Sequence, residues 1–153
     1  MRKIAAIGCG QWGKNLVRNF SELGVLRTIC EVDPAKMSAL RDQFQEINIT
    51  SSFSDILEDD QVAGVAIATP ASSHYSLAKQ ALLAGKDVFV EKPMALTAAE
   101  GESMKVVAEQ TGCILMVGHL LEYHPAVVKL RDLIDSGKLG KVNYVYSNRL
   151  NFG

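Results

Sequence analysis

The sequence predicts an α/β fold, in which helices cover both faces of a doubly wound parallel sheet. Short apolar runs alternate along the chain with segments whose apolar residues repeat at helical spacing. These runs are continuously apolar rather than alternating, which is typical of parallel strands buried on both faces. The 153 residues also suffice for one domain with a sizeable core.

The elements follow one another as β-α-β units. The predicted strands span residues 3–8, 26–32, 48–50, 62–69, 88–90 and 113–117. The predicted helices span residues 11–23, 54–58, 72–83, 97–110 and 125–135, with a further helix that opens at Asp33-Pro34. In the first helix, Trp12, Leu16 and Phe20 recur on one helical face, and Gly24 follows as a stop signal. Pro34 suits the first turn of its helix.

The last segment has a different pattern, because apolar and polar side chains alternate over residues 142–150. Alternation predicts a half-buried strand of an open, antiparallel sheet. We therefore expect residues 1–137 to form the α/β domain and residues 138–153 to begin a second, truncated one. Because an unpaired strand edge tends to join another chain, we expect a homo-oligomer or a frayed tail.

Composition excludes several classes of protein. The 16 basic and 17 acidic residues give a net charge of −1 without a basic stripe, so we expect no nucleic-acid partner. The longest charge-free stretch, residues 61–78, contains a proline and a histidine and predicts no bilayer span. The apolar run of residues 4–7 is too short for a secretory signal, which predicts a cytoplasmic protein. The scattered Cys9, Cys30 and Cys113 predict neither a disulfide framework nor a metal site.

A GxGxxG motif follows the first predicted strand directly and opens the first predicted helix. Gly8 permits a tight turn, Gly10 lets the backbone approach a pyrophosphate, and Gly13 lets helix and strand pack closely. Gln11 and Trp12 complete the loop, and the free N–H groups of the helix N-terminus favour an anion. This context predicts a Rossmann-type dinucleotide site, with a glycine-rich turn that binds no ligand as the alternative.

An acidic residue, Glu31, ends the second strand 18 residues after Gly13. Its carboxylate is placed to accept hydrogen bonds from the adenosine ribose hydroxyls and to repel a 2′-phosphate, which favours NAD over NADP. Asp33 is the rival for this role, although its position before a proline at a helix start favours an N-cap. A methyltransferase would also need an acid here, so the acid alone does not decide the cofactor.

Four segments together resemble one known family. They are IGCGQWG, ICEVDP, IATPASSHYSLAKQALLAGKDVFVEKP and GHLLEYHP, and they cover nearly the whole chain in order. They resemble the N-terminal half of the Gfo/Idh/MocA oxidoreductases, where EKP after a buried strand is a specific mark. The resemblance implies an NAD-binding domain over residues 1–137 and the start of a substrate and oligomerisation domain over residues 138–153.

The resemblance also implies a role for individual residues. Lys92 is the expected catalytic lysine, hydrogen-bonded to the substrate hydroxyl whose carbon gives up hydride. Burial and the positive charge of oxidised nicotinamide would favour its neutral, proton-accepting form. Glu91 is expected beside the nicotinamide. Thr69, Pro70 and His74 are expected to line the nicotinamide ribose.

GHLLEYHP and the tail YVYSNRLNFG are similar to the nucleotide-sugar 3-dehydrogenases of surface-polysaccharide and lipid A biosynthesis. This similarity implies oxidation at C3 of a UDP-linked N-acetylated sugar or its uronic acid. Asn148 and Arg149 are expected to point into the substrate site. Pro93 is expected to hold Lys92 in a fixed turn, through a peptide that is often cis in the family.

Two departures from the family pattern restrict what can be carried over. Leu120, Leu121 and Glu122 stand where many relatives have Asn and Arg, so the usual sugar contacts of that loop do not apply. The family's catalytic histidine belongs to a D-x-x-x-H pattern that is expected beyond residue 153. A non-catalytic NAD-binding or regulatory module is therefore the alternative, although such a module has no need of a Glu-Lys-Pro at a strand tip.

Overall fold

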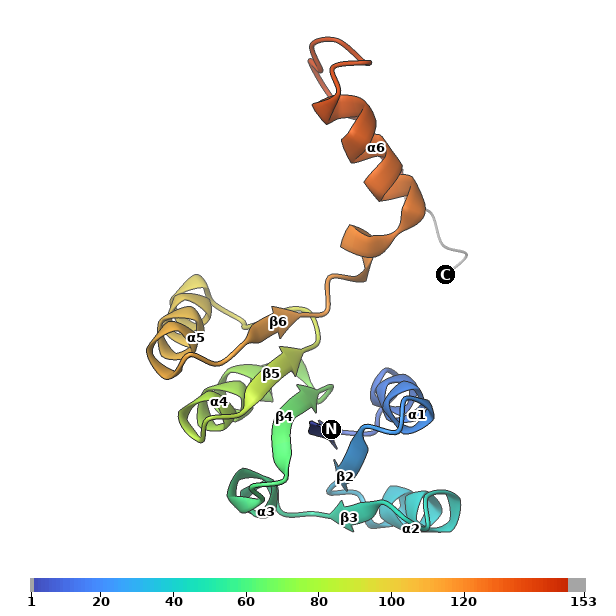
Figure 1. The fold of residues 1–153 in the computed structure, drawn as a ribbon, viewed down its shortest axis with the longest axis vertical. Coiled ribbons are helices and arrows are strands. Elements are labelled where there is room, and N and C mark those ends of the chain that lie inside the picture. Colours follow the sequence, from blue (N-terminus) through green and yellow to red (C-terminus); the bar gives the residue numbers. More distant parts are fainter. Residues whose placement is uncertain (1, 149–153) are drawn as a thin grey trace. The chain divides into compact units, whose positions relative to one another are not determined.

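The computed structural model describes residues 2–148 and is an α/β structure (Figure 1). The strands are β1 (Lys3–Ile7), β2 (Leu26–Cys30), β3 (Asn48–Thr50), β4 (Val62–Ile67), β5 (Asp87–Val90) and β6 (Leu115–Val117). The α-helices are α1 (Gly13–Glu22), α2 (Pro34–Gln43), α3 (Phe53–Glu58), α4 (Ala71–Leu83), α5 (Ala98–Thr111) and α6 (Pro125–Asp135). The predicted order of elements up to residue 135 is confirmed, with ends that differ by a few residues. The short 3-10 helix η1 (Leu120–Tyr123) was not predicted from the sequence.

The strands form one sheet in the order β3-β2-β1-β4-β5-β6, and every neighbouring pair is parallel. The chain builds the sheet outward from β1 in one direction and then from β4 in the other. β1 and β4 are therefore the neighbours at which the strand order reverses. In such sheets a crevice opens at this point, beyond the carboxyl ends of the strands.

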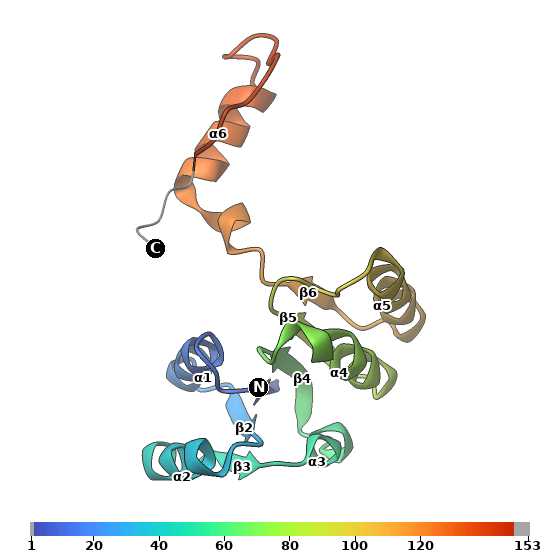
Figure 2. The same cartoon turned by 180° about the vertical axis from the view of Figure 1, so that it is seen from behind.

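Two buried apolar clusters hold helices against opposite faces of the sheet. Ala5 and Ile7 of β1 belong to the cluster that contains residues of α3, α4 and α5. Ala6 points the other way, into the cluster with residues of α1 and α2. Figure 2 shows these two groups of helices on either side of the strands. The predicted doubly wound arrangement is confirmed. No helix within residues 2–148 combines the length and apolar character needed to cross a membrane.

The chain divides into two compact units, Met1–Gly118 and His119–Gly153. The first contains the whole sheet, and the second contains η1 and α6. The boundary that the sequence suggests, after residue 137, concerns the functional division between cofactor and substrate domains and stays a prediction.

The strand predicted over residues 142–150 is wrong for the part that the structure describes. Residues 142–148 form no strand and are exposed, and the last two residues of the predicted strand lie outside the described range. Alternating side chains favour a strand only where a second strand accepts its backbone hydrogen bonds. None of the described residues pairs with this segment. The expected self-association depended on an exposed strand edge, and residues 142–148 do not form that strand.

Leu82 and Leu83 are adjacent on α4 but lie in opposite environments, 0% and 63% exposed. Leu82→Ala is expected to lower the free energy of unfolding by about 2–5 kcal/mol, because it leaves a cavity between α4 and the sheet. Leu83→Ala removes the same atoms from the surface and should change stability by no more than about 0.5 kcal/mol. Urea unfolding of both variants measures the difference, and equal losses would contradict the assigned packing.

Candidate functional site

A cavity of about 250 Å³ lies where the loops after β1, β4 and β5 meet. Its lining brings together most of the predicted site residues, from parts of the sequence that lie far apart: Gly10, Gln11, Trp12, Thr69, Pro70, His74, Glu91 and Lys92, with Ala68 and Ala71. All of them belong to the first compact unit. The cavity occupies the place where the strand order reverses, as the sheet topology leads one to expect.

The glycine-rich loop has the geometry that a dinucleotide requires. Gly8 has a positive φ of 83°, and a Cβ there would lie 2.8 Å from Cγ2 of Thr69. A Cβ at Gly13 would lie only 1.9 Å from the Gly8 carbonyl oxygen, so α1 can approach β1 only with glycine at this position. A Cβ at Gly10 would have no neighbour within 4 Å, which leaves space beside the backbone. No side chain caps the N-terminus of α1, and the N–H groups of Lys14 and Asn15 bond to the carbonyl oxygens of Gly10 at 3.2 Å and Trp12 at 2.9 Å. The positive end of the helix dipole still favours an anion such as a pyrophosphate here.

Glu31 is buried, and its carboxylate holds the glycine-rich loop in place. It accepts hydrogen bonds from the backbone N–H groups of Cys9 at 2.8 Å, Val32 at 2.9 Å and Asp33 at 3.1 Å. A carboxylate has about four acceptor positions, so these contacts leave little capacity for a ribose. The predicted contact of Glu31 with the ribose hydroxyls stays a prediction, and the carboxylate has a structural role in the loop that the sequence analysis did not identify.

The cysteine thiols near this carboxylate are unsuited to chemistry at neutral pH. Burial and the charge of Glu31 raise the pKa of Cys9 to about 12, and the same two causes raise the pKa of Cys30 to about 11. A nucleophilic or metal-binding cysteine has to be a thiolate. Both residues therefore act here as small apolar side chains. Among residues 2–148, no three His, Cys, Asp or Glu side chains gather into a group that could hold a metal ion.

Asp33 caps α2, as its position before a proline indicates. Its carboxylate accepts hydrogen bonds from the N–H groups of Ala35 at 2.9 Å and Lys36 at 3.4 Å. The backbone hydrogen bonds from Lys36 and Ala35 hold the pKa of the Asp33 carboxyl below its usual range. The N-cap role expected for Asp33 is thereby confirmed, and the ribose contact of Glu31 stays a prediction.

His74 lines the cavity but offers no free nitrogen to it. Its Nδ1 lies 2.7 Å from the Pro93 carbonyl oxygen, and its Nε2 lies 2.9 Å from the Thr69 carbonyl oxygen. Both nitrogens are therefore occupied by the backbone, and a polar contact from His74 to a ribose is not available. Beside it, Ser73 donates through its hydroxyl to Thr69 Oγ1 at 2.7 Å, which orders the loop after β4.

At the tip of β5, the glutamate is buried and the lysine is exposed. Glu91 accepts a hydrogen bond from the Lys92 backbone N–H at 3.3 Å. Its Oε2 packs on Gly118, where a Cβ would lie only 3.1 Å away. The Lys92–Pro93 peptide is cis. The burial that we expected for Lys92 is not supplied by residues 2–148, where this side chain reaches solvent.

Gly118 packs against the Glu91 carboxylate, and the sequence analysis did not single it out. It follows β6 directly, at the same edge of the sheet as Glu91, and this placement could have signalled it. Neither of the two predicted substrate residues belongs to the first unit. Asn148 is exposed in the second unit and donates to the Tyr146 hydroxyl at 3.0 Å, and Arg149 lies outside the described residues. Their contact with substrate stays a prediction.

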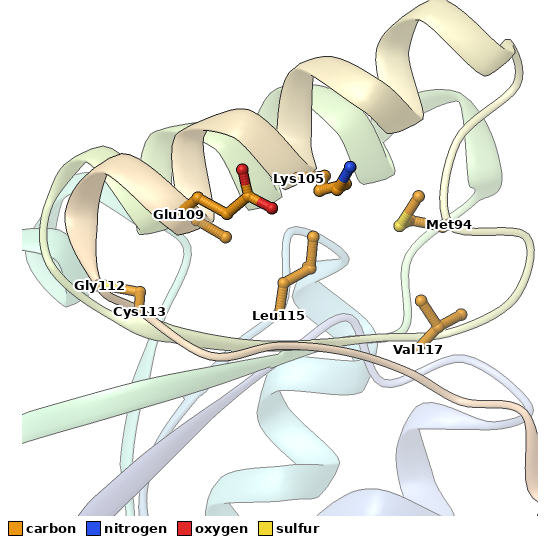
Figure 3. A pocket seen from close by; sticks show the side chains of 8 residues that line it. Met94, Lys105, Glu109, Gly112, Cys113, Leu115 and Val117 are labelled. Carbon is orange, nitrogen blue, oxygen red and sulfur yellow. The ribbon is translucent and has the colours of Figure 1, made fainter.

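A second hollow, of about 530 Å³, lies between α5 and β6 (Figure 3). Met94, Leu115 and Val117 form its apolar floor, and Lys105 and Glu109 of α5 stand at its rim. It is larger than the first cavity. It contains none of the predicted site residues and lies away from the glycine-rich loop, so size alone does not mark the functional site.

Comparison with known families agrees with this geometry. A model of the Gfo/Idh/MocA proteins, described as an oxidoreductase family with an NAD-binding Rossmann fold, matches residues 2–119. The chain belongs to this family. The match contains every strand of the sheet and every loop that lines the first cavity, so NAD is the cofactor of this domain.

Relatives of known structure or name include several inositol dehydrogenases. The scyllo-inositol 2-dehydrogenase (NAD(+)) of Bacillus subtilis (strain 168) is 32% identical over 93% of this chain and 42% of that protein. The scyllo-inositol 2-dehydrogenase (NADP(+)) of the same organism is 29% identical over 93% and 41%. A crystal structure of scyllo-inositol dehydrogenase from Lactobacillus casei with bound NAD(H) and scyllo-inositol is 25% identical, with a TM-score of 0.83 over 92% of this chain and 42% of that one. The chain thus spans less than half the length of these relatives.

Gly13 and Gly10 allow the structural and binding roles of the loop to be separated. Gly13→Ala is expected to lower the urea midpoint of unfolding, because its Cβ would meet the Gly8 carbonyl oxygen at 1.9 Å. Gly10→Ala should leave that midpoint unchanged while NADH affinity falls about tenfold or more, since the methyl group occupies the space needed by the pyrophosphate. Calorimetric titration measures the affinity. Parental NADH affinity in Gly10→Ala would remove this residue from the cofactor site.

Proposed function

We propose that this chain is the cofactor half of an NAD-dependent dehydrogenase that oxidises a secondary hydroxyl on a polyhydroxylated ring. The observation that carries the proposal is the cavity shared by the glycine-rich loop and the tip of β5. A module that only binds a nucleotide needs the glycine-rich loop, but it does not need a lysine that lines the same cavity. A methyltransferase is not supported, because the family match is to an NAD-binding oxidoreductase domain.

Each group in the cavity has a place in this reaction. The loop around Gly10 and the N-terminus of α1 bind the pyrophosphate, and Glu31 keeps that loop closed and accepts one ribose hydroxyl. Bound NAD supplies the carbon that accepts the hydride. Lys92, in its neutral form, accepts the proton of the substrate hydroxyl as the ring carbon gives up its hydride to bound NAD. Glu91 offsets the positive charge of Lys92 beside the nicotinamide.

The ring that is oxidised belongs to one of two chemical classes. Inositols are supported by the names of the relatives, which include the scyllo-inositol 2-dehydrogenase (NAD(+)). A UDP-linked N-acetylated sugar or its uronic acid, oxidised at C3, is supported by the resemblance of GHLLEYHP and the tail to nucleotide-sugar 3-dehydrogenases. Both classes present a ring hydroxyl to Lys92. Only the second carries a nucleotide that needs binding residues beyond those described.

A substrate panel tests the proposal and chooses between the classes. A protein that extends past residue 153 to the length of the relatives should produce NADH with scyllo- or myo-inositol, or with UDP-N-acetylglucosamine or its uronic acid. The 153-residue chain alone should bind NADH but produce none, because the reacting carbon and hydride acceptor must be held within about 3–3.5 Å of each other. NADH formation by the 153-residue chain alone would contradict the proposal. So would the failure of both proteins to form NADH with any ring alcohol of the panel.

Cofactor preference follows from Glu31 and from the absence of a basic residue over residues 32–35. NADH is expected to bind more tightly than NADPH, because the carboxylate repels a 2′-phosphate. A charge-assisted bond to ribose is worth about 1.5–3 kcal/mol, so Glu31→Ala should weaken NADH roughly 10- to 150-fold. Calorimetry with both cofactors is the measurement, and Glu22→Ala, an exposed change on α1, is the control. Equal or tighter binding of NADPH by the parent would refute this preference.

Lys92 is expected to matter for turnover and not for cofactor binding. In the longer protein, Lys92→Met should reduce kcat about 10²- to 10⁴-fold, the usual effect of losing a positioned proton-transfer group. NADH affinity should stay at the parental value. Lys105→Met, an exposed lysine at the rim of the second hollow, serves as the matched control. A near-parental kcat in Lys92→Met would exclude the assigned role.

A further inference from the structure

We infer that the indole of Trp12 packs against the nicotinamide ring of the bound cofactor and favours the oxidised, positively charged form of that ring. This assigns Trp12 to the end of the cofactor where hydride is exchanged, whereas the glycines of the same loop serve the pyrophosphate. The inference rests on the proposed function in one respect, because it places the nicotinamide in the cavity that Lys92 lines.

The Trp12 side chain lines the first cavity without contributing to the core. It is 51% exposed, and it belongs to neither of the two buried apolar clusters of the described residues. Its backbone is fixed all the same, since Trp12 is the N-cap of α1 and the next residue, Gly13, packs on the Gly8 carbonyl. Aromatic side chains that line a cavity in this way are typical of ligand sites. A bound ligand would bury the apolar surface that the folded chain leaves open.

The composition of the cavity lining indicates which end of the cofactor Trp12 contacts. Trp12 lines the cavity together with Thr69 of the loop after β4 and Lys92 of the β5 tip. Glu31, the residue expected at the adenosine ribose, is buried and is not among the lining residues. The adenosine and nicotinamide ends of a dinucleotide lie on either side of its pyrophosphate. Trp12 therefore stands on the nicotinamide side.

The charge of the oxidised ring gives the indole a preference between the two forms of the cofactor. The nicotinamide ring of NAD is a cation, and addition of a hydride removes its charge. The face of an indole attracts a cation more strongly than the face of a phenyl ring does. In the described part of the chain, Trp12 is the one Phe, Tyr or Trp side chain that lines this cavity. Glu91 also favours a positive ring, but its contribution stays constant when only residue 12 is changed.

Fluorescence of the 153-residue chain tests the contact directly, because Trp12 is its only tryptophan. Oxidised NAD does not absorb at the wavelengths that tryptophan emits, so it quenches the emission only by accepting an electron from the excited indole, which requires contact. Saturating NAD should therefore remove most of the Trp12 emission. ADP-ribose, which lacks the nicotinamide, should leave most of it. Equal quenching by the two ligands would overturn the contact.

Calorimetric titration with NAD, NADH and ADP-ribose measures the effect of the contact on affinity. Trp12→Leu keeps an apolar side chain but removes the aromatic face. It should weaken NAD about 2- to 30-fold, which corresponds to about 0.5–2 kcal/mol. NADH should be weakened less than NAD, and ADP-ribose should keep its parental affinity. Trp12→Phe, which retains an aromatic face, should preserve more of the NAD affinity than Trp12→Leu does.

The control variant changes another exposed apolar side chain next to the same helix. Leu23 is the C-cap of α1, is 66% exposed and does not line the cavity. Leu23→Ala should retain the parental affinity for all three ligands. Circular dichroism of each variant confirms that it is folded.

The outcomes separate this inference from the proposed function. Equal weakening of NAD and ADP-ribose in Trp12→Leu would show that the indole acts on the loop and not on the nicotinamide. Equal weakening of NAD and NADH would overturn the preference for the oxidised ring. In both cases the parent still binds the cofactor, and the proposed function stands. A parent that binds none of the three ligands would refute the proposed function and this inference together.

Discussion

The parallel register of the central strands brings the last residues of three strands to one level of the sheet. Ile7 of β1 lies beside Ile67 of β4, which lies beside Val90 of β5. Each strand therefore delivers its following loop to the same edge. The glycine-rich loop, the loop at Thr69 and the tip at Lys92 meet there as a consequence of backbone hydrogen bonding. The chemistry of the site depends on this alignment before it depends on any side chain.

Side chains beneath the cavity then hold these loops in position. Glu31 and Glu91 each stand one residue past a strand, and both carboxylates are buried and turned toward backbone N–H groups. His74 performs the complementary task, since its ring meets two carbonyl oxygens. The carboxylates thus satisfy donors that the strand ends leave unpaired, and the histidine ring lies within hydrogen-bond distance of two acceptors. A site built this way has a rigid base before any ligand arrives.

Much of this arrangement could be predicted from the sequence, because local chemistry determined it. Continuous apolar runs identified the strands, and the spacing of Gly8, Gly10 and Gly13 identified a turn, an open approach and a close contact that the structure bears out. The Asp33 cap was readable from the proline that follows it. The packing of Gly118 on Glu91 could not be predicted from the sequence, because these residues follow separate strands that become neighbours only in the folded sheet. The wrong prediction of a strand over residues 142–148 has the same cause. Alternating apolar and polar side chains show that a segment can form a strand, but not whether a second strand pairs with it.

The residues at the base of the cavity are buried, whereas the lysine that we propose as catalytic is exposed at its mouth. Glu31, His74 and Glu91 are buried, whereas Trp12 and Lys92 face solvent. The buried groups fix backbone positions, which requires low mobility and full hydrogen bonding. In the proposed function Lys92 has the opposite requirement, because its amine must meet a substrate that enters and leaves. The lysine therefore stands on a backbone that buried side chains hold in place, while its own side chain stays accessible to a substrate.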